Sequence, residues 1–371
     1  MLCLDGSYGE GGGQIVRTSL SLAALLGEAV RITNIRAGRE KPGLRAQHLT
    51  AVRAVAQVTG GELEGATLGS RDLTFRPRAP RGGNYVFDVG EVIGSAGSVT
   101  LVLQTLLPPL LAAREPTTMT LRGGTHVPWS PPVHYIMQVF LPALAELGGR
   151  VTLSLNRWGW YPRGGGEIKV TVAPASGFSG QQWLTPPEPA GFRGLSAGCR
   201  VPEHVIHRQA RRLKERLGKD FPITEVTAEG LDPGSFVFIY GPRAGFHALG
   251  ARGKPAEQVA DEAAAAFDRF KARQAALDRH LADQVVLYLA LARGPSAFTT
   301  EEVTRHLLTN IWVIEQFLGP TFTVQGNLGE PGLVSCSGHR RNPVPDHANS
   351  VLLDRRSAAT YGNFSGNQKT G

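Results

Sequence analysis

Apolar residues recur at three- and four-residue spacing in three segments of the chain, and each segment ends at a glycine. The segments are His48–Gly60, His134–Gly148 and His306–Gly319. This spacing predicts amphipathic helices, and a glycine directly after the last turn is a common helix end. A strand-like segment follows each of them, at ELEGATL, RVTLSL and TFTVQG.

A second helical pattern precedes each of these helices. These earlier helices are expected at Gly13–Leu26, Gly97–Ala113 and Leu281–Leu291, and the first two lead into the β-rich segments RITNIR and TMTLRGG. The same order of elements therefore recurs three times. We predict an α/β fold of three repeated units, each a helix pair on a small β-sheet, around one shared core.

The block between the second and third units has a different character. It contains the charged helix EHVIHRQARRLKERLG and the Ala-rich helix PAEQVADEAAAAFDRFKARQAAL, separated by strand-like SFVFIYG. We predict a main domain that begins with repeats one and two over 1–182 and is completed by repeat three over 278–337. The block over 183–277 is predicted to be an inserted small α/β domain with a scaffold or substrate-guiding role. The segment 338–371 has little periodicity and is expected to be a disordered tail.

Composition supports a soluble globular protein, with 42% hydrophobic and 19% charged residues. No apolar run approaches the ~18 residues of a membrane span, and the start MLCLDGSYGEGGG lacks a secretory-signal pattern. Only three cysteines occur, too far apart for a metal cluster or a disulfide framework. We therefore expect a cytoplasmic protein with no membrane partner.

The chain is basic, with a formal net charge of +8, and Arg outnumbers Lys by 32 to 7. Because arginine binds phosphate oxygens with a planar fork, this balance favours a polyanionic partner such as a nucleotide or nucleic acid. A codon bias that replaces Lys by Arg over the whole surface explains the balance equally well.

The N-terminal segment DGSYGEGGGQIVR places five glycines around Glu10, directly before the first helix. Glycines allow close approach of a phosphate, and a helix N-terminus favours an anion. We interpret Glu10 as a ligand of a divalent cation and Arg17 as a phosphate contact. The segment is neither a Walker A loop nor a GxGxxG fingerprint, and a tight turn with an exposed acid is the alternative.

A second loop concentrates positive charge. Arg36, Arg39 and Lys41 lie within six positions, and Gln47 and His48 open the following helix. A solvated charge run is the usual explanation of such density. Its place at a loop-to-helix junction favours phosphate binding instead.

The second and third units carry polar residues at matching places. Gln104 lies within an apolar helix, where its amide needs a ligand or a backbone partner, and Pro131 and Tyr135 are suited to enclose a flat base or simply to pack. In the third unit, His306 lies at the head of the second helix, while Asp283 and Gln284 lie in the first. A lone histidine in a helix is usually structural.

Together these residues resemble the RNA 3'-terminal phosphate cyclase family. The matching segments are, in the family's order, DGSYGEGGGQIVR, NIRAGREKPGLRAQHLTAV, GSAGSVTLVLQT, GGTHVPWSPP, WYPRGGGE, HLADQ and HLLTNIWVIEQF. The similarity covers roughly residues 1–337. It implies the same fold, three α/β units with a small α/β domain inserted before the third.

The resemblance also implies an activity. Members of the family consume ATP to convert an RNA 3'-phosphate into a 2',3'-cyclic phosphate, through AMP attached to a histidine that matches His306. A divalent cation, Mg or Mn, would be held in part by Glu10. The adenosine pocket would include Pro131, Tyr135, Asp283 and Gln284, with Gln104 near the α-phosphate. The phosphates of ATP and the RNA end would be bound by Arg17, Arg36, Arg39, Gln47 and His48.

Tyr135 and His280 stand where some relatives carry other aromatic residues, which alters the expected pocket wall. Two rival functions remain: a non-catalytic RNA-binding or ribosome-assembly relative, which would lack the nucleophilic histidine, and an enzyme that adenylates another polynucleotide end. The sequence does not determine the oligomeric state, the preferred metal or the physiological RNA. It also does not show which of the five phosphate-binding residues contact ATP and which contact RNA.

Overall fold

The computed structural model describes residues 1–91 and 96–339. The predicted disordered tail therefore lies outside the described residues from 340 onward. Its first two residues are described, and the backbone N–H of His339 donates to the carbonyl of Ala292 at 2.9 Å. The α/β class predicted from the sequence is confirmed.

Three four-stranded sheets have one and the same topology. In each, the first two strands are parallel and the other two pairs are antiparallel, in the spatial order first, second, fourth, third. The strands are β1 (Leu2–Asp5), β2 (Val30–Thr33), β4 (Leu73–Arg76) and β3 (Glu62–Glu64); β5 (Gly83–Asp88), β6 (Thr117–Gly123), β8 (Gly166–Ala173) and β7 (Arg150–Arg157); and β10 (Gln182–Trp183), β16 (Ser296–Thr300), β18 (Gly332–Cys336) and β17 (Phe322–Gln325).

Each sheet is richer than the sequence pattern indicated, because only the strands after the helices were expected. The first strands β1, β5 and β10 were missed, as were the hairpin partners β4, β8 and β18 and the strand β16 of the third unit. Several of these strands have only two to four residues, too few for alternation of apolar and polar positions to be visible. A further short pair is formed by β9 (Phe178–Ser179) and β15 (Ala292–Arg293).

The helices of the three units follow the predicted positions closely. They are α1 (Gly13–Leu26) and α2 (Ala46–Thr59); α3 (Val99–Leu111), α4 (Val133–Tyr135) and α5 (Leu141–Glu146); and α8 (Arg279–Ala290) and α9 (Arg305–Leu318). Helices α1 and α2 end at glycines in the left-handed region, Gly27 and Gly60, and of these two only Gly60 was predicted from the sequence.

The second helix of the middle unit is not continuous. A π-helical turn, η1 (Ile136–Phe140), separates α4 from α5, and Pro142 follows at the start of α5. Proline has no N–H to donate to the carbonyl four residues earlier, so the regular α-helical pattern cannot continue through this point.

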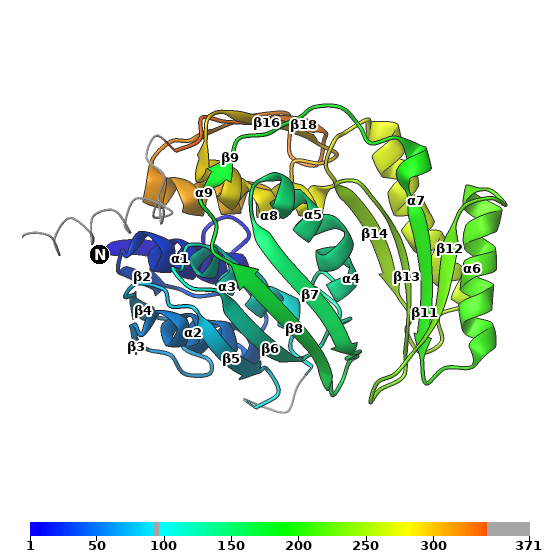
Figure 1. Cartoon of the computed structure of the whole chain (residues 1–371), viewed down its shortest axis with the longest axis horizontal. Helices are drawn as coiled ribbons and strands as arrows, with labels where there is room; N and C mark the ends of the chain where they lie inside the picture. The colour runs from blue at the N-terminus through cyan, green and yellow to red at the C-terminus, as the bar shows by residue number, and fades with distance from the viewer. Residues whose placement is uncertain (92–95, 340–371) are drawn as a thin grey trace, which may run out of the picture.

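The block inserted between β10 and α8 forms its own sheet, in the order β12-β11-β13-β14. Its elements are the 3₁₀ turn η2 (Pro189–Gly191), β11 (Arg193–Cys199), α6 (Glu203–Leu217), β12 (Ile223–Ala228), β13 (Gly234–Gly241), β14 (Ala244–Leu249) and α7 (Ala256–Arg273). It lies at one end of the molecule, on the right of Figure 1, and has a separate apolar core that includes Phe192, Val237 and Phe267. The precise domain boundaries remain a prediction, and β10 of the third sheet precedes the insert.

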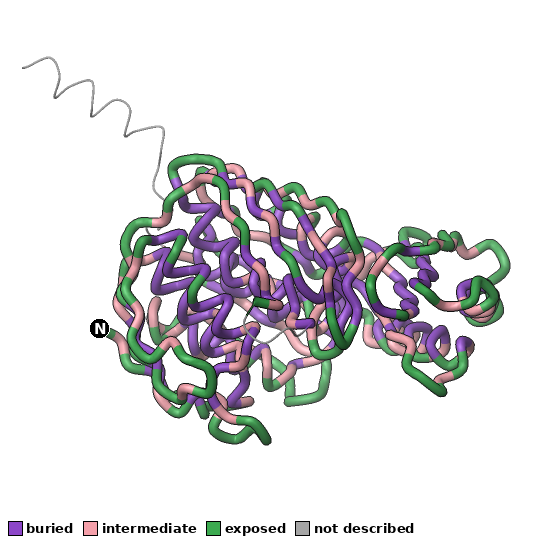
Figure 2. The backbone as a smooth tube through the Cα atoms, turned by 90° about the horizontal axis from the view of Figure 1, so that it is seen from below, coloured by how far each residue is buried: buried purple, intermediate pink, exposed green. Residues whose placement is uncertain are grey.

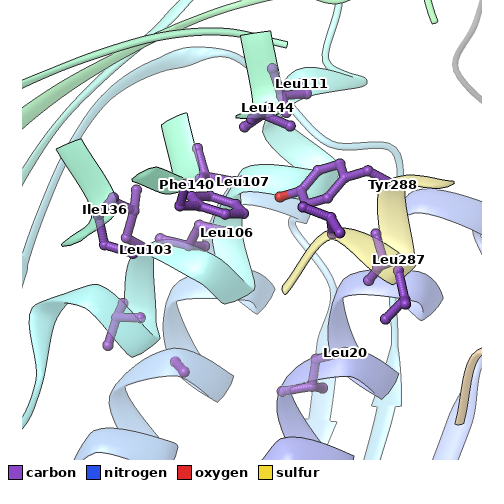
Figure 3. Close-up of a cluster of buried hydrophobic side chains, with 14 of the residues drawn as sticks. Leu20, Leu103, Leu106, Leu107, Leu111, Ile136, Phe140, Leu144, Leu287 and Tyr288 are labelled. Atoms are coloured by element: carbon purple, nitrogen blue, oxygen red, sulfur yellow. The ribbon is translucent and has the colours of Figure 1, made fainter. Parts of the chain in front are cut away.

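Helices from the three units pack on one another, and the sheets lie outside them (Figure 1). Figure 2 shows the resulting continuous buried interior, with exposed residues confined largely to loops and outer edges. At its centre Leu106, Leu107 and Phe140 meet Tyr288 of α8, all at most 2% exposed (Figure 3). No helix in the described ranges has the length and apolar character needed to cross a bilayer.

Truncation of Leu106 tests this shared core. Because its side chain is fully buried between helices of two units, Leu106→Ala should lower the free energy of unfolding by about 2–5 kcal/mol. Leu68→Ala, at a position that is 46% exposed, should change it by less than about 0.5 kcal/mol. Urea unfolding measures both, and equal effects would contradict the packing described.

Candidate active site

One large cavity, of about 840 Å³, lies where the three units meet. This volume is within the range typical of small-molecule sites, about 300–1,000 Å³. All twelve candidate site residues predicted from the sequence line it, namely Glu10, Arg17, Arg36, Arg39, Gln47, His48, Gln104, Pro131, Tyr135, Asp283, Gln284 and His306. The structure thus brings together residues from segments almost 300 positions apart; the role of each remains a prediction.

The N-terminal turns of four helices reach this cavity. They contribute Gly13 of α1, His48 of α2, His280 of α8 and His306 of α9. Helix N-termini carry unpaired N–H groups and the positive end of the helix dipole. Four arginines against two carboxylates in the lining add to this positive field. The cavity is therefore suited to a polyanion.

The glycines of the N-terminal loop allow close packing at this point. A Cβ on Gly13 would lie 2.1 Å from Nε2 of His48, and a Cβ on Gly9, whose φ is +59°, would lie 2.3 Å from the hydroxyl of Thr309. That hydroxyl accepts from the backbone N–H of Glu10 at 3.1 Å. The glycines thus let the loop dock on both α2 and α9.

His306 lies against Asp283 across the two helices of the third unit. Its Nδ1 is buried 2.8 Å from Oδ1 of Asp283, although the N–H is not aligned for a linear hydrogen bond. Burial and the charge of Arg17 lower the pKa of His306, whereas the charge and contact of Asp283 and the charge of Glu10 raise it. The raising effects are larger, so the pKa of His306 lies above its ordinary value. Nδ1 is therefore the protonated atom, which leaves the lone pair on Nε2.

A series of hydrogen bonds connects this pair to Arg17 of the first unit. Asn310 Nδ2 donates to the carbonyl of Asp283 at 2.7 Å, and the hydroxyl of Thr18 donates to Asn310 Oδ1 at 2.7 Å. Gln14 Nε2 donates to Thr18 at 2.9 Å and its Oε1 accepts from Arg17 at 2.6 Å. These hydrogen bonds hold the Asp283 backbone and the Arg17 guanidinium in fixed positions relative to each other.

The sequence analysis missed Gln14, Thr18 and Asn310. A signal for them existed, because Gln14 and Thr18 are four residues apart on one helix face, and Asn310 follows His306 by four. All three are polar residues on predicted amphipathic helices, and polar side chains that are buried need partners. Nothing in the spacing indicated that the two helices would meet.

His48 and Arg17 are two further donors in the cavity lining. Nδ1 of His48 accepts from the backbone N–H of Arg45 at 3.2 Å, so the ring carries its proton on Nε2. Burial, then the charges of Arg17, Arg36 and Arg45, lowers the pKa of His48 to about 3. Burial also lowers the pKa of Arg17 to about 10, against the raising effect of Asp283 and Glu10. At neutral pH, His48 is therefore an uncharged hydrogen-bond donor, whereas Arg17 is a charged one.

Two of the glutamine amides that line the cavity have unsatisfied atoms. Among the described residues, Nε2 of Gln104 and Oε1 of Gln284 are buried without a hydrogen-bond partner. Such atoms are costly unless a ligand or water meets them. The alternative that a backbone group satisfies the Gln104 donor is wrong in this structure. Gln47 differs, since its Oε1 accepts from the backbone N–H of Ser98 at 3.3 Å.

The arginines of the second loop already have protein partners. Nη1 of Arg36 donates to the carbonyls of Lys41 and Gly43 at 2.7 and 2.9 Å, which shapes the loop. Nη2 of Arg39 pairs with Glu10 at 2.5 Å. Their remaining N–H groups are available to an anion at the half-exposed side of the cavity.

A metal site built wholly of protein ligands is not present, because the described ranges contain no group of three or more His, Cys, Asp or Glu that could hold an ion. Glu10 supplies one carboxylate, at present paired with Arg39. Mg²⁺ is commonly held by one or two carboxylates together with substrate phosphates and water. Glu10, as a single carboxylate in a cationic cavity, fits a cation that is held mainly by substrate phosphates and water.

Asp278 is a further residue that was not predicted from the sequence. It is fully buried, caps α8 by accepting from the backbone N–H groups of His280 and Leu281, and accepts from the hydroxyl of Tyr135 and from Gly245 of the insert. Burial raises its pKa to about 6 in spite of these hydrogen bonds. Tyr135 therefore borders the cavity with its ring, while its hydroxyl is occupied.

The comparisons with known proteins agree with this arrangement. A family model described as RNA 3'-terminal phosphate cyclase matches residues 8–324. Proteins named RNA 3'-terminal phosphate cyclase from Methylococcus capsulatus, Pyrobaculum neutrophilum and Pyrococcus furiosus are 49%, 47% and 41% identical to this chain. The alignments cover 85%, 87% and 90% of this chain and 91%, 94% and 98% of the respective relatives.

The fold and the cavity define an α/β protein with a cationic cavity, suited to phosphate-bearing ligands, that contains a histidine paired with a carboxylate. The chain belongs to the RNA 3'-terminal phosphate cyclase family.

The state of the His306 ring is directly measurable. We expect the His306 resonances in an NMR titration to report a pKa above the ordinary value of about 6.5, since the Asp283 carboxylate favours the charged ring. In Asp283→Asn the raising charge is gone while burial and Arg17 still lower the pKa, so the midpoint should fall below that of the wild type. Asp220→Asn, in an exposed loop, should leave it unchanged. An unaltered midpoint in Asp283→Asn would refute the pairing.

Proposed function

We propose that this protein uses ATP to convert an RNA 3'-terminal phosphate into a 2',3'-cyclic phosphate, through AMP carried covalently on His306. The observation that carries the proposal is the pairing of His306 with Asp283 inside a cationic cavity. Membership of the cyclase family supports the same activity and the use of ATP.

In the first step Nε2 of His306 attacks the α-phosphorus of ATP, the bond to the β-phosphate oxygen breaks, and pyrophosphate leaves. The ring becomes cationic as the N–P bond forms. The Asp283 carboxylate, 2.8 Å from Nδ1, stabilises that charge and keeps the ring oriented. Asp283 was expected in the adenosine pocket; its contact with Nδ1 favours a positioning role instead.

The adenosine would lie between Pro131 on the α4 side and α8, where Gln284 has an unpaired oxygen. The oxygen of Gln284 can accept from a nucleoside N–H or hydroxyl group. The unpaired Nε2 of Gln104 is a donor suited to an α-phosphate oxygen. Both assignments rest on the same physical argument, that buried polar atoms require partners.

An oxygen of the RNA 3'-phosphate next attacks the phosphorus of the adenylate. The N–P bond breaks, its electron pair returns to Nε2, and AMP moves to the RNA end. The neighbouring ribose 2'-hydroxyl then loses its proton, attacks the 3'-phosphorus and expels AMP, an intramolecular step that avoids the entropic cost of joining two reactants. Arg17, His48, Gln47, Arg36 and Arg39 would bind the phosphates of ATP and RNA in these steps.

Glu10 would hold a divalent cation together with the phosphates of ATP. Such a cation, Mg²⁺ or Mn²⁺, supplies Lewis-acid stabilisation of negative charge on phosphate oxygens. Arg39, now paired with Glu10, would be released toward the phosphates when the carboxylate binds the cation.

The two rival functions have less support. A non-catalytic RNA-binding relative has no need for an ionically paired histidine in a cavity, and this chain has one. An enzyme that adenylates another polynucleotide end would share the covalent step, so only the identity of the product distinguishes it.

Covalent adenylation tests the first step. Wild-type protein incubated with [α-³²P]ATP and Mg²⁺ should retain label after denaturing electrophoresis, and His306→Ala should retain none. His204→Ala, which changes an exposed histidine on α6, is the matched control and should label like the wild type. Equal labelling of His306→Ala and wild type would reject the assignment.

The rate of adenylation should depend on pH through His306. Only the neutral ring can attack, so the rate should fall as the pH decreases through the raised pKa of this histidine. In Asp283→Asn the fall should occur at lower pH, and the plateau rate should drop because the developing cation has lost its carboxylate. Single-turnover rates at a series of pH values measure both; identical profiles would contradict the role given to Asp283.

A further inference from the structure

Trp129 is an exposed aromatic residue that neither the core nor the proposed chemistry uses. Its side chain is 99% exposed, the highest value among the large hydrophobic residues of the described ranges. Its φ is +64°, a conformation that bulky side chains rarely adopt. No ring contact to Trp129 is found within the described part of the chain. The exposed indole and the strained backbone of Trp129 do not contribute to the stability of the fold. Both features are typical of functional loops.

The loop that carries Trp129 is fixed on both sides. The hydroxyl of Ser130 donates to the carbonyl of Val127 at 3.1 Å, and Thr100 donates to the carbonyl of Pro131 at 2.7 Å. The backbone N–H of Val133 donates to Thr125 at 3.0 Å, which closes the loop at the start of α4. These hydrogen bonds hold the loop in a conformation that keeps the indole exposed to solvent.

Trp129 belongs to the lining of the candidate active site. It lines the cavity together with Ser130 and Pro131, while Arg36 and Arg39, with free N–H groups, contribute to the same lining. Being almost fully exposed, it stands at the open side of the cavity, whereas His306 and Asp283 are largely covered. If the phosphate of a ligand binds deep in the cavity, the part of the ligand that stays outside lies beside the indole.

We propose that Trp129 is the stacking platform for the terminal nucleobase of the RNA substrate. This inference rests on the proposed function, since an RNA 3'-phosphate that reaches the adenylate on His306 must leave its base outside. An indole face stacks on any base, and exposed aromatics on preformed loops are a general means of binding single-stranded RNA. The adenine of ATP is the less suitable occupant, because the unpaired atoms that await a ligand, on Gln104 and Gln284, are buried inside.

Kinetics with 3'-phosphorylated oligoribonucleotides test the proposal. Trp129→Ala should raise the KM for RNA by about 5- to 150-fold, the range expected for loss of one stacked base, and leave the KM for ATP and the yield of labelled enzyme without RNA unchanged. Trp129→Phe should recover most of the RNA affinity because it keeps an aromatic face. Tyr161→Ala, which removes an aromatic residue that is 71% exposed and outside the cavity lining, is the matched control and should resemble the wild type.

A substrate without its terminal base isolates the contact. With an oligonucleotide whose last ribose bears a 3'-phosphate but no base, the wild type should lose as much RNA affinity as Trp129→Ala does with the complete substrate, and Trp129→Ala should show no further loss. An unchanged KM for RNA in Trp129→Ala, or a raised KM for ATP instead, would overturn the proposal. If the wild type forms no cyclic phosphate at all, the proposed function fails, a result distinct from either of these.

Discussion

The contact between His306 and Asp283 is the interaction on which the account of this site depends. It joins the first helix of the third unit, α8, to the second, α9, and determines which ring nitrogen retains a lone pair. Asn310 holds the backbone of Asp283, and the hydrogen bonds through Thr18 and Gln14 extend this order to Arg17 of the first unit. The orientation of the histidine is therefore fixed by two units, as the proposed attack by its ring nitrogen requires.

The repeated fold explains why such a site lies at the junction of the units. The first and third units direct helix N-termini inward, so their assembly collects dipoles and unpaired N–H groups around one cavity. The insert is tied to the same place, because the backbone N–H of Gly245 on β14 binds Asp278, the residue that caps α8. A Cβ at Gly245 would lie 3.0 Å from the ring of Tyr135, so close packing of the insert on the cavity wall depends on this glycine.

Much of this arrangement could be predicted from sequence, and the parts that could not have a common cause. The helix predicted at His48–Gly60 followed from apolar spacing and a terminal glycine. All twelve candidate residues line the cavity, and several of them, such as Arg39 and His306, lie in loops or at helix starts that carry unusual polar side chains. Asn310 and Asp278 were missed because their partners lie far away in sequence, and periodicity contains no information on which helices meet. The two-residue strand β10 was missed because it is shorter than one period of alternation.

The most direct test of the central claim is the site and chemistry of attachment of AMP to the protein. Wild-type protein reacted with ATP and Mg²⁺, then digested and analysed by tandem mass spectrometry and ³¹P and ¹⁵N NMR, should carry a single phosphoramidate on Nε2 of His306, because Nδ1 faces Asp283. Attachment to Nδ1, to another side chain, or to none would contradict the account.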